Sequence, residues 1–153
     1  MYKPIGLTNE SVTVSLSSPS DDASDSQEQA SETGLRQAVE DYYKAVDRKD
    51  WNYTYDKLDS QTQQRFTRSE WIQKNQYLAD IDPLVRSTPE IVSEVSTSSP
   101  VEVTLTQTFR NGTTRSRTTY FVWEGGSWKH RFSNEELDLF MAGTSFEEFK
   151  KVR

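Results

Sequence analysis

The sequence predicts an α+β domain, in which N-terminal helices pack on a curved antiparallel sheet of about four strands and a C-terminal helix follows. Apolar residues recur at helical spacing over residues 35–79. After Pro89 they alternate with polar residues, with the period of two that is typical of strands. Two glycine-bearing turns, Asn111-Gly112 and Gly125-Gly126, then separate three consecutive strands.

A single domain is expected from 153 residues, a length sufficient to bury a core. The formal net charge of −6 is unevenly distributed along the chain. Residues 1–34 contain one lysine and six acidic residues, whereas residues 35–153 carry 17 basic and 18 acidic groups. A nearly neutral body with an acidic N-terminal segment lacks the basic face that nucleic-acid binding requires. We therefore expect no nucleic-acid partner.

Aromatic side chains compensate for an apolar content of 33%. All 18 aromatic residues except Tyr2 lie between Tyr42 and Phe149, and each buries ~150–250 Å². The sequence has no cysteine and one histidine, which excludes disulfides, thiol catalysis and metal sites built from several histidines. We expect no metal and no cofactor. No apolar run approaches the ~20 residues of a membrane span.

Residues 1–33 are expected to form a disordered acidic tether, and residues 34–153 the folded domain. The segment 8–33 is dominated by Ser, Asp, Glu, Gln and Thr and contains no aromatic residue. Such a composition buries too little apolar surface to offset the entropy lost on ordering. The short alternation within residues 12–16 could instead form a strand or docking peptide, but its polar flanks favour the tether.

Three helices are expected before the sheet. Apolar residues at helical spacing predict an amphipathic helix over about 35–49, and Asp50 is a suitable N-cap for the next helix. Ser60 and Thr67 each begin a capping-box spacing, with Gln or Glu three residues later. The last helix is expected to stop before Pro83, because proline disfavours helical geometry in the residue before it.

The relative register of the hairpins can be derived from the side-chain period of two. A two-residue turn at Gly125-Gly126 pairs Trp123 with Trp128 and Phe121 with His130. For these side chains to share a face with the valines of strand 101–109, Phe109 must pair with Thr113. That pairing requires a three-residue loop, 110–112, with its glycine in a left-handed conformation. The expected strands are 91–95, 101–109 and the two that flank Gly125-Gly126.

The C-terminal residues predict two more short helices. Ser133 begins a third capping-box spacing with Glu136. The segment SFEEFKKV forms the last helical turn, with Phe146 and Phe149 on it. We expect this tail to lie against the sheet.

The order of these elements resembles the NTF2-like (cystatin-like superfamily) cone over residues 34–142. The resemblance is carried by the opening helix VEDYYKAVDRKDW, the segment YDKL, the motif TRSEW and the closing pair FVW…GGSWK. It implies helices that cover the concave face of a curled sheet. It implies no single activity, because this fold hosts isomerases, hydrolases, dehydratases and binding modules.

Family members that resemble ketosteroid isomerase or scytalone dehydratase use an aspartate, or an aspartate paired with histidine, together with tyrosine. This chain has no aspartate between Asp82 and Asp138. We therefore assign no catalytic residue and expect a binding or protein-interaction module. The alternative is a small-molecule enzyme of isomerase or dehydratase type that uses His130 and a tyrosine.

Each candidate site residue has a functional and a structural interpretation. His130 is either a general acid or base in the mouth of the cone or a hydrogen-bonded structural ring. Arg115 and Arg117 either bind an anionic group or are exposed charges on a strand end. We favour the structural interpretation for all three. The aromatic residues of the helices, which include Tyr42, Tyr43, Tyr53, Tyr55 and Trp71, either line a ligand cavity or form the core; their helical spacing favours the core.

If a ligand binds, the residues expected to contact it are Tyr42, Tyr55, Trp71, Arg117, Phe121 and His130. The ligand would be small and either apolar or anionic. A second copy of the chain is another expected partner, because Tyr120 and Val122 lie on the outer face of the sheet and need cover. The tether followed by one domain resembles exported or lipoprotein-anchored bacterial proteins. This resemblance implies an extracytoplasmic location, with a cytoplasmic one as the alternative.

Overall fold

The computed structural model describes residues 27–153, so most of the predicted tether lies outside the described part of the chain. Folded structure begins before the predicted boundary at residue 34. Helix α2, Glu32–Asp47, has Ser31 as its N-cap. The indole Nε1 of Trp128 donates a 2.7 Å hydrogen bond to the carbonyl oxygen of Gln29. The residues just before α2 are therefore attached to the sheet.

Four helices whose bounds the structure gives, rather than the expected three, lie between residue 32 and the sheet. They are α2 and the shorter helices α3 Trp51–Asp56, α4 Ser60–Gln63 and α5 Arg68–Ile81. The predicted N-cap of α3 is confirmed, because Asp50 accepts a hydrogen bond from the N–H of Tyr53. The predicted capping box of α5 is confirmed at Thr67.

The capping box expected at Ser60 is wrong. Asp59 caps α4 instead, accepting a 3.0 Å hydrogen bond from the N–H of Thr62. The carboxylate of Asp59 also accepts a 2.7 Å hydrogen bond from Arg131. This bond holds the carboxylate at the N-terminus of α4. The N–H of Ser60 donates to Glu124 of the sheet.

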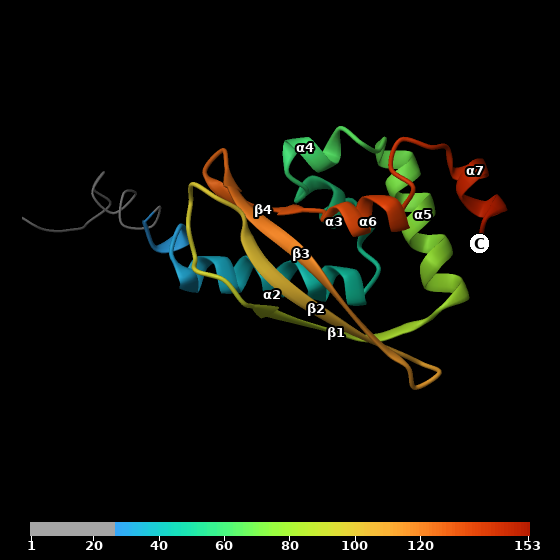
Figure 1. Cartoon of the computed structure of the whole chain (residues 1–153), viewed down its shortest axis with the longest axis horizontal. Coiled ribbons are helices and arrows are strands. Elements are labelled where there is room, and N and C mark those ends of the chain that lie inside the picture. The colour runs from blue at the N-terminus through green and yellow to red at the C-terminus, as the bar shows by residue number, and fades with distance from the viewer. Residues whose placement is uncertain (1–26) are drawn as a thin grey trace, which may run out of the picture.

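The sheet has four antiparallel strands in chain order, β1 Leu84–Ile91, β2 Val101–Phe109, β3 Thr114–Glu124 and β4 Ser127–Arg131. The α+β class is confirmed: helices cover one side of a curled sheet, and helical segments follow it (Figure 1).

The first strand begins earlier than expected. The sequence predicted a strand over 91–95, but β1 begins at Leu84 and contains Pro89, which lies opposite Leu105. Proline is tolerated there because β1 is an edge strand and needs no partner on its outer side.

The predicted hairpin registers are confirmed. Val101 lies opposite Phe121 in β2–β3, and the N–H of Phe109 donates a 2.9 Å bond to Thr113. Gly112 has φ of 91°, the left-handed conformation that the three-residue loop requires. In β3–β4, Phe121 lies opposite His130, as expected from the two-residue turn. The strand residues with large inward side chains therefore share one face of the sheet.

Two apolar clusters fill most of the space under this face. The first lies between α2 and the sheet, and the second lies between α3, α5, α6 and the end of β4. Figure 1 shows α2 running along the sheet and α5 at the end towards which the β2–β3 hairpin points. The first cluster contains Leu35, Val39, Tyr42, Tyr43, Val101, Val103, Leu105, Phe121 and Trp128, and the second Trp51, Leu58, Phe66, Trp71, Phe132 and Phe140.

The two helices of the C-terminal segment pack on different parts of the fold. Helix α6, Asn134–Leu139, has the predicted Ser133 capping box and contacts β3. Helix α7, Phe146–Lys151, packs on α5 rather than on the sheet, with Phe149 against Tyr77. The linker turns towards α5 because the Nζ of Lys74 bonds two of its carbonyl oxygens. No helix in residues 27–153 is long and apolar enough to cross a membrane.

Candidate functional site

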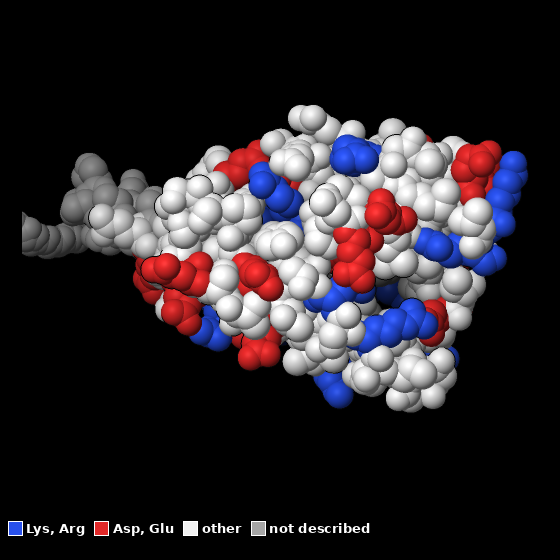
Figure 2. Space-filling model, in the orientation of Figure 1, with Lys and Arg blue, Asp and Glu red and all other residues white. Residues whose placement is uncertain are grey.

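A cavity of about 340 Å³ lies between α2, α5, α6 and the concave face of the sheet. Its volume falls in the ~300–1,000 Å³ range of small-molecule sites. On the surface in view, Figure 2 shows a hollow bordered by basic side chains, between α6 and the β2–β3 hairpin. Its apolar walls are Val46, Trp51, Trp71, Leu78, Ala79, Ile81, Leu84, Phe109, Phe132, Leu139 and Phe140.

A larger groove of about 560 Å³ lies on the outer surface between α2, α3 and the β3–β4 turn. Its wall carries charged residues of both signs, Asp41 and Lys57 among them. Within the described residues, the Nδ1 of His130 is the one buried side-chain nitrogen or oxygen without a hydrogen-bond partner. Because His130 lines the inner cavity and not the outer groove, we place the candidate site in the inner cavity.

Four of the six predicted ligand-binding residues line this cavity: Tyr42, Trp71, Arg117 and His130. Tyr55 does not. Its hydroxyl donates a 3.0 Å bond to the carbonyl of Phe66, and its ring packs on Trp71.

Phe121 does not line the inner cavity either, and its largely buried ring lies instead in the wall of the outer groove. It is 1% exposed and stacks on His130 with ring centroids 5.0 Å apart. Phe121 thus packs against the ring of His130 and helps to fix its orientation. The expectation that the helix aromatics are core holds for Tyr42, Tyr43 and Trp71, which are each at most 3% exposed. It is wrong for Tyr53 and Tyr55, which are only half-buried.

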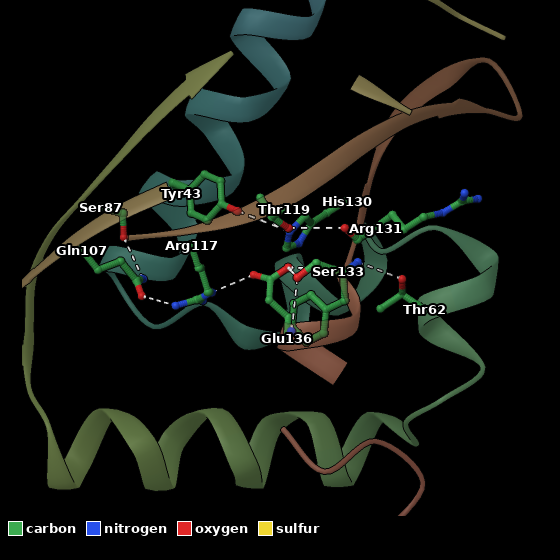
Figure 3. Close-up of polar contacts among 11 residues, drawn as sticks. Tyr43, Thr62, Ser87, Gln107, Arg117, Thr119, His130, Arg131, Ser133 and Glu136 are labelled. Atoms are coloured by element: carbon green, nitrogen blue, oxygen red, sulfur yellow. Dashed lines mark hydrogen bonds and ion pairs between the residues drawn. The ribbon is translucent and has the colours of Figure 1, made fainter. Parts of the chain in front are cut away.

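His130 is held in place through both its backbone and its imidazole ring. Its N–H donates to the carbonyl of Lys57 and its carbonyl accepts from Asp59, a parallel bridge that covers the free edge of β4. The imidazole Nε2 lies 2.6 Å from the hydroxyl of Thr119 and 3.3 Å from that of Tyr43 (Figure 3). The ring is 2% exposed, so the structural interpretation describes its surroundings well.

Three titratable side chains at this end of the cavity, those of His130, Tyr43 and Tyr42, are neutral at pH 7. Burial, reinforced by the charge of Arg117, lowers the pKa of His130 to about 3. Burial, with Glu136 next, raises the pKa of Tyr43 well above its ordinary value. Burial and Tyr43 raise the pKa of Tyr42 likewise. The three side chains therefore act as uncharged hydrogen-bonding groups.

Arg117 is part of a buried polar network. Its Nε donates a 2.8 Å bond to Glu136 of α6, and its Nη1 a 2.9 Å bond to Gln107 of β2 (Figure 3). The side chain of Glu136 is 0% exposed and that of Arg117 is 18% exposed. The preferred interpretation of Arg117 as an exposed edge charge is therefore wrong, because α6 covers this part of β3.

Arg115 lies two residues earlier on β3 and reaches the cavity mouth. Its side chain is 64% exposed, as expected for the strand end. Its Nη2 lies 2.9 Å from the carboxylate of Asp82, the C-cap of α5. The ion pair thus joins β3 and α5 across the cavity mouth.

Sequence reasoning missed Glu136, Gln107 and Asn75 as parts of the site. Glu136 was identified only as a capping-box residue, which it is. Its second role depends on the position of α6 over β3, and no local pattern indicates that position. Gln107 gave a detectable signal, because it is the polar residue on the inward face of β2. Asn75 lines the cavity from α5.

The arrangement can hold an apolar body and bond a polar group at its inner end. No group of three or more His, Asp or Glu side chains is placed to hold a metal ion within residues 27–153. Asp82 in the cavity wall and Glu136, which lies beside Arg117, are each paired with an arginine.

Comparisons with known proteins give little further assignment. No protein-family model matches the sequence, and no curated protein matches it. Among solved structures, the chain is similar to the solution structure of a SEC-C motif containing protein from Rhodopseudomonas palustris. That match has 18% sequence identity and a TM-score of 0.47, and covers 67% of this chain and 76% of the other. This likeness assigns neither a family nor a function to the chain.

Proposed function

We propose that this chain is an NTF2-like domain that binds a small, mainly apolar ligand in its inner cavity and performs no chemistry on it. The observation that carries the proposal is a ligand-sized cavity whose wall contains His130, the residue whose buried Nδ1 has no hydrogen-bond partner in the described residues. Leaving such a group unbonded costs ~1–3 kcal/mol. A polar atom of a ligand would remove that cost.

The order of elements supports the NTF2-like assignment. A long helix, short helices and a helix that begins with the TRSEW motif precede a curled four-stranded antiparallel sheet. The cavity lies where the helices and the sheet diverge, a position in which this fold can enclose a ligand.

One observation favours the alternative, an enzyme of isomerase or dehydratase type. The hydroxyl of Tyr43 lies 3.3 Å from the Nε2 of His130, within reach for proton transfer. A general base works best when its pKa is near the working pH, and the pKa of His130 is about 3. The raised pKa of Tyr43 makes it a weak acid. The directions of these two pKa shifts therefore support binding over catalysis.

Ligand-induced thermal shifts test the proposal. A panel of small apolar compounds should contain members that raise the Tm of the wild-type protein, because a ligand that binds the folded state stabilises it. Replacing Ala79 with leucine fills part of the cavity from α5. Gln73→Leu places the same side chain on an exposed position of α5 and serves as the control.

The expected result is a set of shifts that Gln73→Leu retains and Ala79→Leu reduces. No shift across the panel, or equal shifts in both variants, would contradict a ligand site in this cavity.

A second copy as partner and an extracytoplasmic location stay predictions. The dimer was expected because Tyr120 and Val122 need cover on the outer face of the sheet. Val122 is already only 7% exposed, so the reason for the dimer is weaker. Light scattering of the purified chain would measure the mass directly.

A further inference from the structure

The structure also points to the chemical class of the ligand, an inference that rests on the proposed ligand-binding function. We infer that the cavity takes an uncharged molecule, with an apolar body and a hydrogen-bonding oxygen that contacts Tyr42, Arg117 and His130. Anionic ligands, which the sequence left open as an alternative to apolar ones, are disfavoured.

Three polar groups of the cavity wall have bonding capacity left. The hydroxyl of Tyr42, the Nη2 of Arg117 and the Nδ1 of His130 have no hydrogen-bond partner within residues 27–153. All three belong to side chains that are more than four-fifths buried. Ligand sites typically combine apolar walls with a few convergent polar groups of this kind.

The three groups lie close together. The ring centroids of Tyr42 and His130 are 4.4 Å apart. Arg117 lines the same cavity as Tyr42 and His130. Tyr42 lies between this cavity and the outer groove and lines both. The polar group of a ligand in the inner cavity can therefore contact side chains from α2, β3 and β4.

The charges of the wall do not favour an anion. The positive charge of Arg117 is already neutralised by Glu136, whose side chain is 0% exposed. A ligand carboxylate beside Arg117 would lie near this second buried carboxylate, and burying an uncompensated charge is costly. At the mouth, Arg115 is paired with Asp82 in the same way.

Arg153 is the remaining cation of the cavity wall, and it is exposed. Its guanidinium stacks on Phe149, with 4.5 Å to the ring centroid. Water screens the charge of such a group, so it attracts an anion only weakly. The inner end of the cavity thus offers hydrogen bonds to a ligand and has no net positive charge.

His130 fits an uncharged head group in either tautomer. Its Nε2 bonds the hydroxyls of Thr119 and Tyr43, each of which can donate or accept. The Nδ1 is accordingly free to donate to a ligand oxygen or to accept from a ligand hydroxyl or amide. An amide group of a ligand suits both tautomers, because its oxygen accepts a hydrogen bond and its nitrogen donates one.

The test compares two isosteric probes, 2-naphthamide and 2-naphthoate, by NMR titration of the isotope-labelled protein at pH 7. We expect the amide to bind about tenfold or more tightly than the carboxylate, because like charges brought together in an interior cost more than 1.4 kcal/mol, the equivalent of tenfold. Tyr42→Phe should weaken amide binding about three- to tenfold, since it removes one hydrogen bond. Tyr53→Phe, a change at the outer groove, should leave amide binding unchanged.

The outcomes separate the two proposals. Equal or tighter binding of 2-naphthoate, or an amide affinity that Tyr42→Phe does not change, would overturn the inference and leave the ligand-binding function standing. Absence of binding by both probes would contradict the ligand-binding function as well.

Discussion

Replacing Glu136 with glutamine tests whether a buried ion pair attaches α6 to the sheet. The Oε2 of Glu136 accepts a 2.8 Å bond from Arg117, and its Oε1 accepts a 3.0 Å bond from the N–H of Ser133. Glutamine keeps the acceptor that caps α6 and removes the charge. Breaking a buried pair costs ~3–5 kcal/mol, because the remaining charge is uncompensated. The side chain of Arg117 is 18% exposed and so keeps part of its solvation, and we expect about 2 kcal/mol for Glu136→Gln.

The assay is urea unfolding followed by circular dichroism, on the wild type, Glu136→Gln, Arg117→Met and the double variant. A loss of 2 kcal/mol lowers the urea midpoint by roughly 0.7–2 M, since m is about 1–3 kcal/mol/M for small proteins. The double variant should lose less than the sum of the single losses, with a coupling of about 1–3 kcal/mol. A loss below ~0.5 kcal/mol for Glu136→Gln, with no coupling, is the behaviour of an exposed pair and would refute the reasoning.

Three other predictions concern separate parts of the fold. Burial lowers the pKa of His130 from 6.5 in the unfolded chain to about 3 in the folded protein. The contribution of the neutral ring to the free energy of unfolding is therefore complete above pH 6.5 and is lost as the pH falls towards 3. Between pH 6.5 and 4.5 the wild type should lose about 2 kcal/mol more than His130→Phe in urea titrations, and equal losses would show that the pKa is not lowered. Lys74→Met removes the two bonds to the linker after α6. Amide exchange in α7 should then rise about tenfold while β2 is unchanged, and equal exchange throughout would count against the role of Lys74. Gly126 has φ of 84°, so Gly126→Ala should cost about 1 kcal/mol, and a neutral result would exclude a left-handed turn.

The sheet register could be predicted from the sequence because side chains alternate with an invariable period of two. Two turns and the requirement that Val101 and Phe121 share one face were sufficient to place Phe109 opposite Thr113. The positions of Asp50 and Thr67 as helix caps followed from local chemistry in the same way.

The failures arose where distant residues decide between local alternatives. Ser60 and Asp59 are both acceptable caps, and Arg131 on β4 selects Asp59 by binding its buried carboxylate. The start of β1 was missed because Pro89 was interpreted as a boundary. That interpretation holds for central strands and not for an edge strand.

The candidate site could be predicted only in part, for the same reason. The hairpin register predicted on which face of the sheet His130 lies. The helical spacing of apolar residues predicted that Tyr42 and Trp71 face the sheet. The pairing of Arg117 depends on where α6 crosses β3, a contact that no local pattern specifies. The open volume depends on how several elements pack together, so no single segment of the sequence indicates it.

The most direct test of ligand binding in the inner cavity is the nitrogen NMR spectrum of the imidazole, because His130 is the only histidine in the sequence. Without ligand, both ring nitrogens should show a neutral ring across pH 5–8, since burial lowers the pKa to about 3. Saturating 2-naphthamide should shift Nδ1 more than Nε2, because Thr119 and Tyr43 already bond Nε2. An imidazole that titrates near pH 6.5, or one whose Nδ1 signal does not respond to the bound amide, would contradict a ligand site at His130.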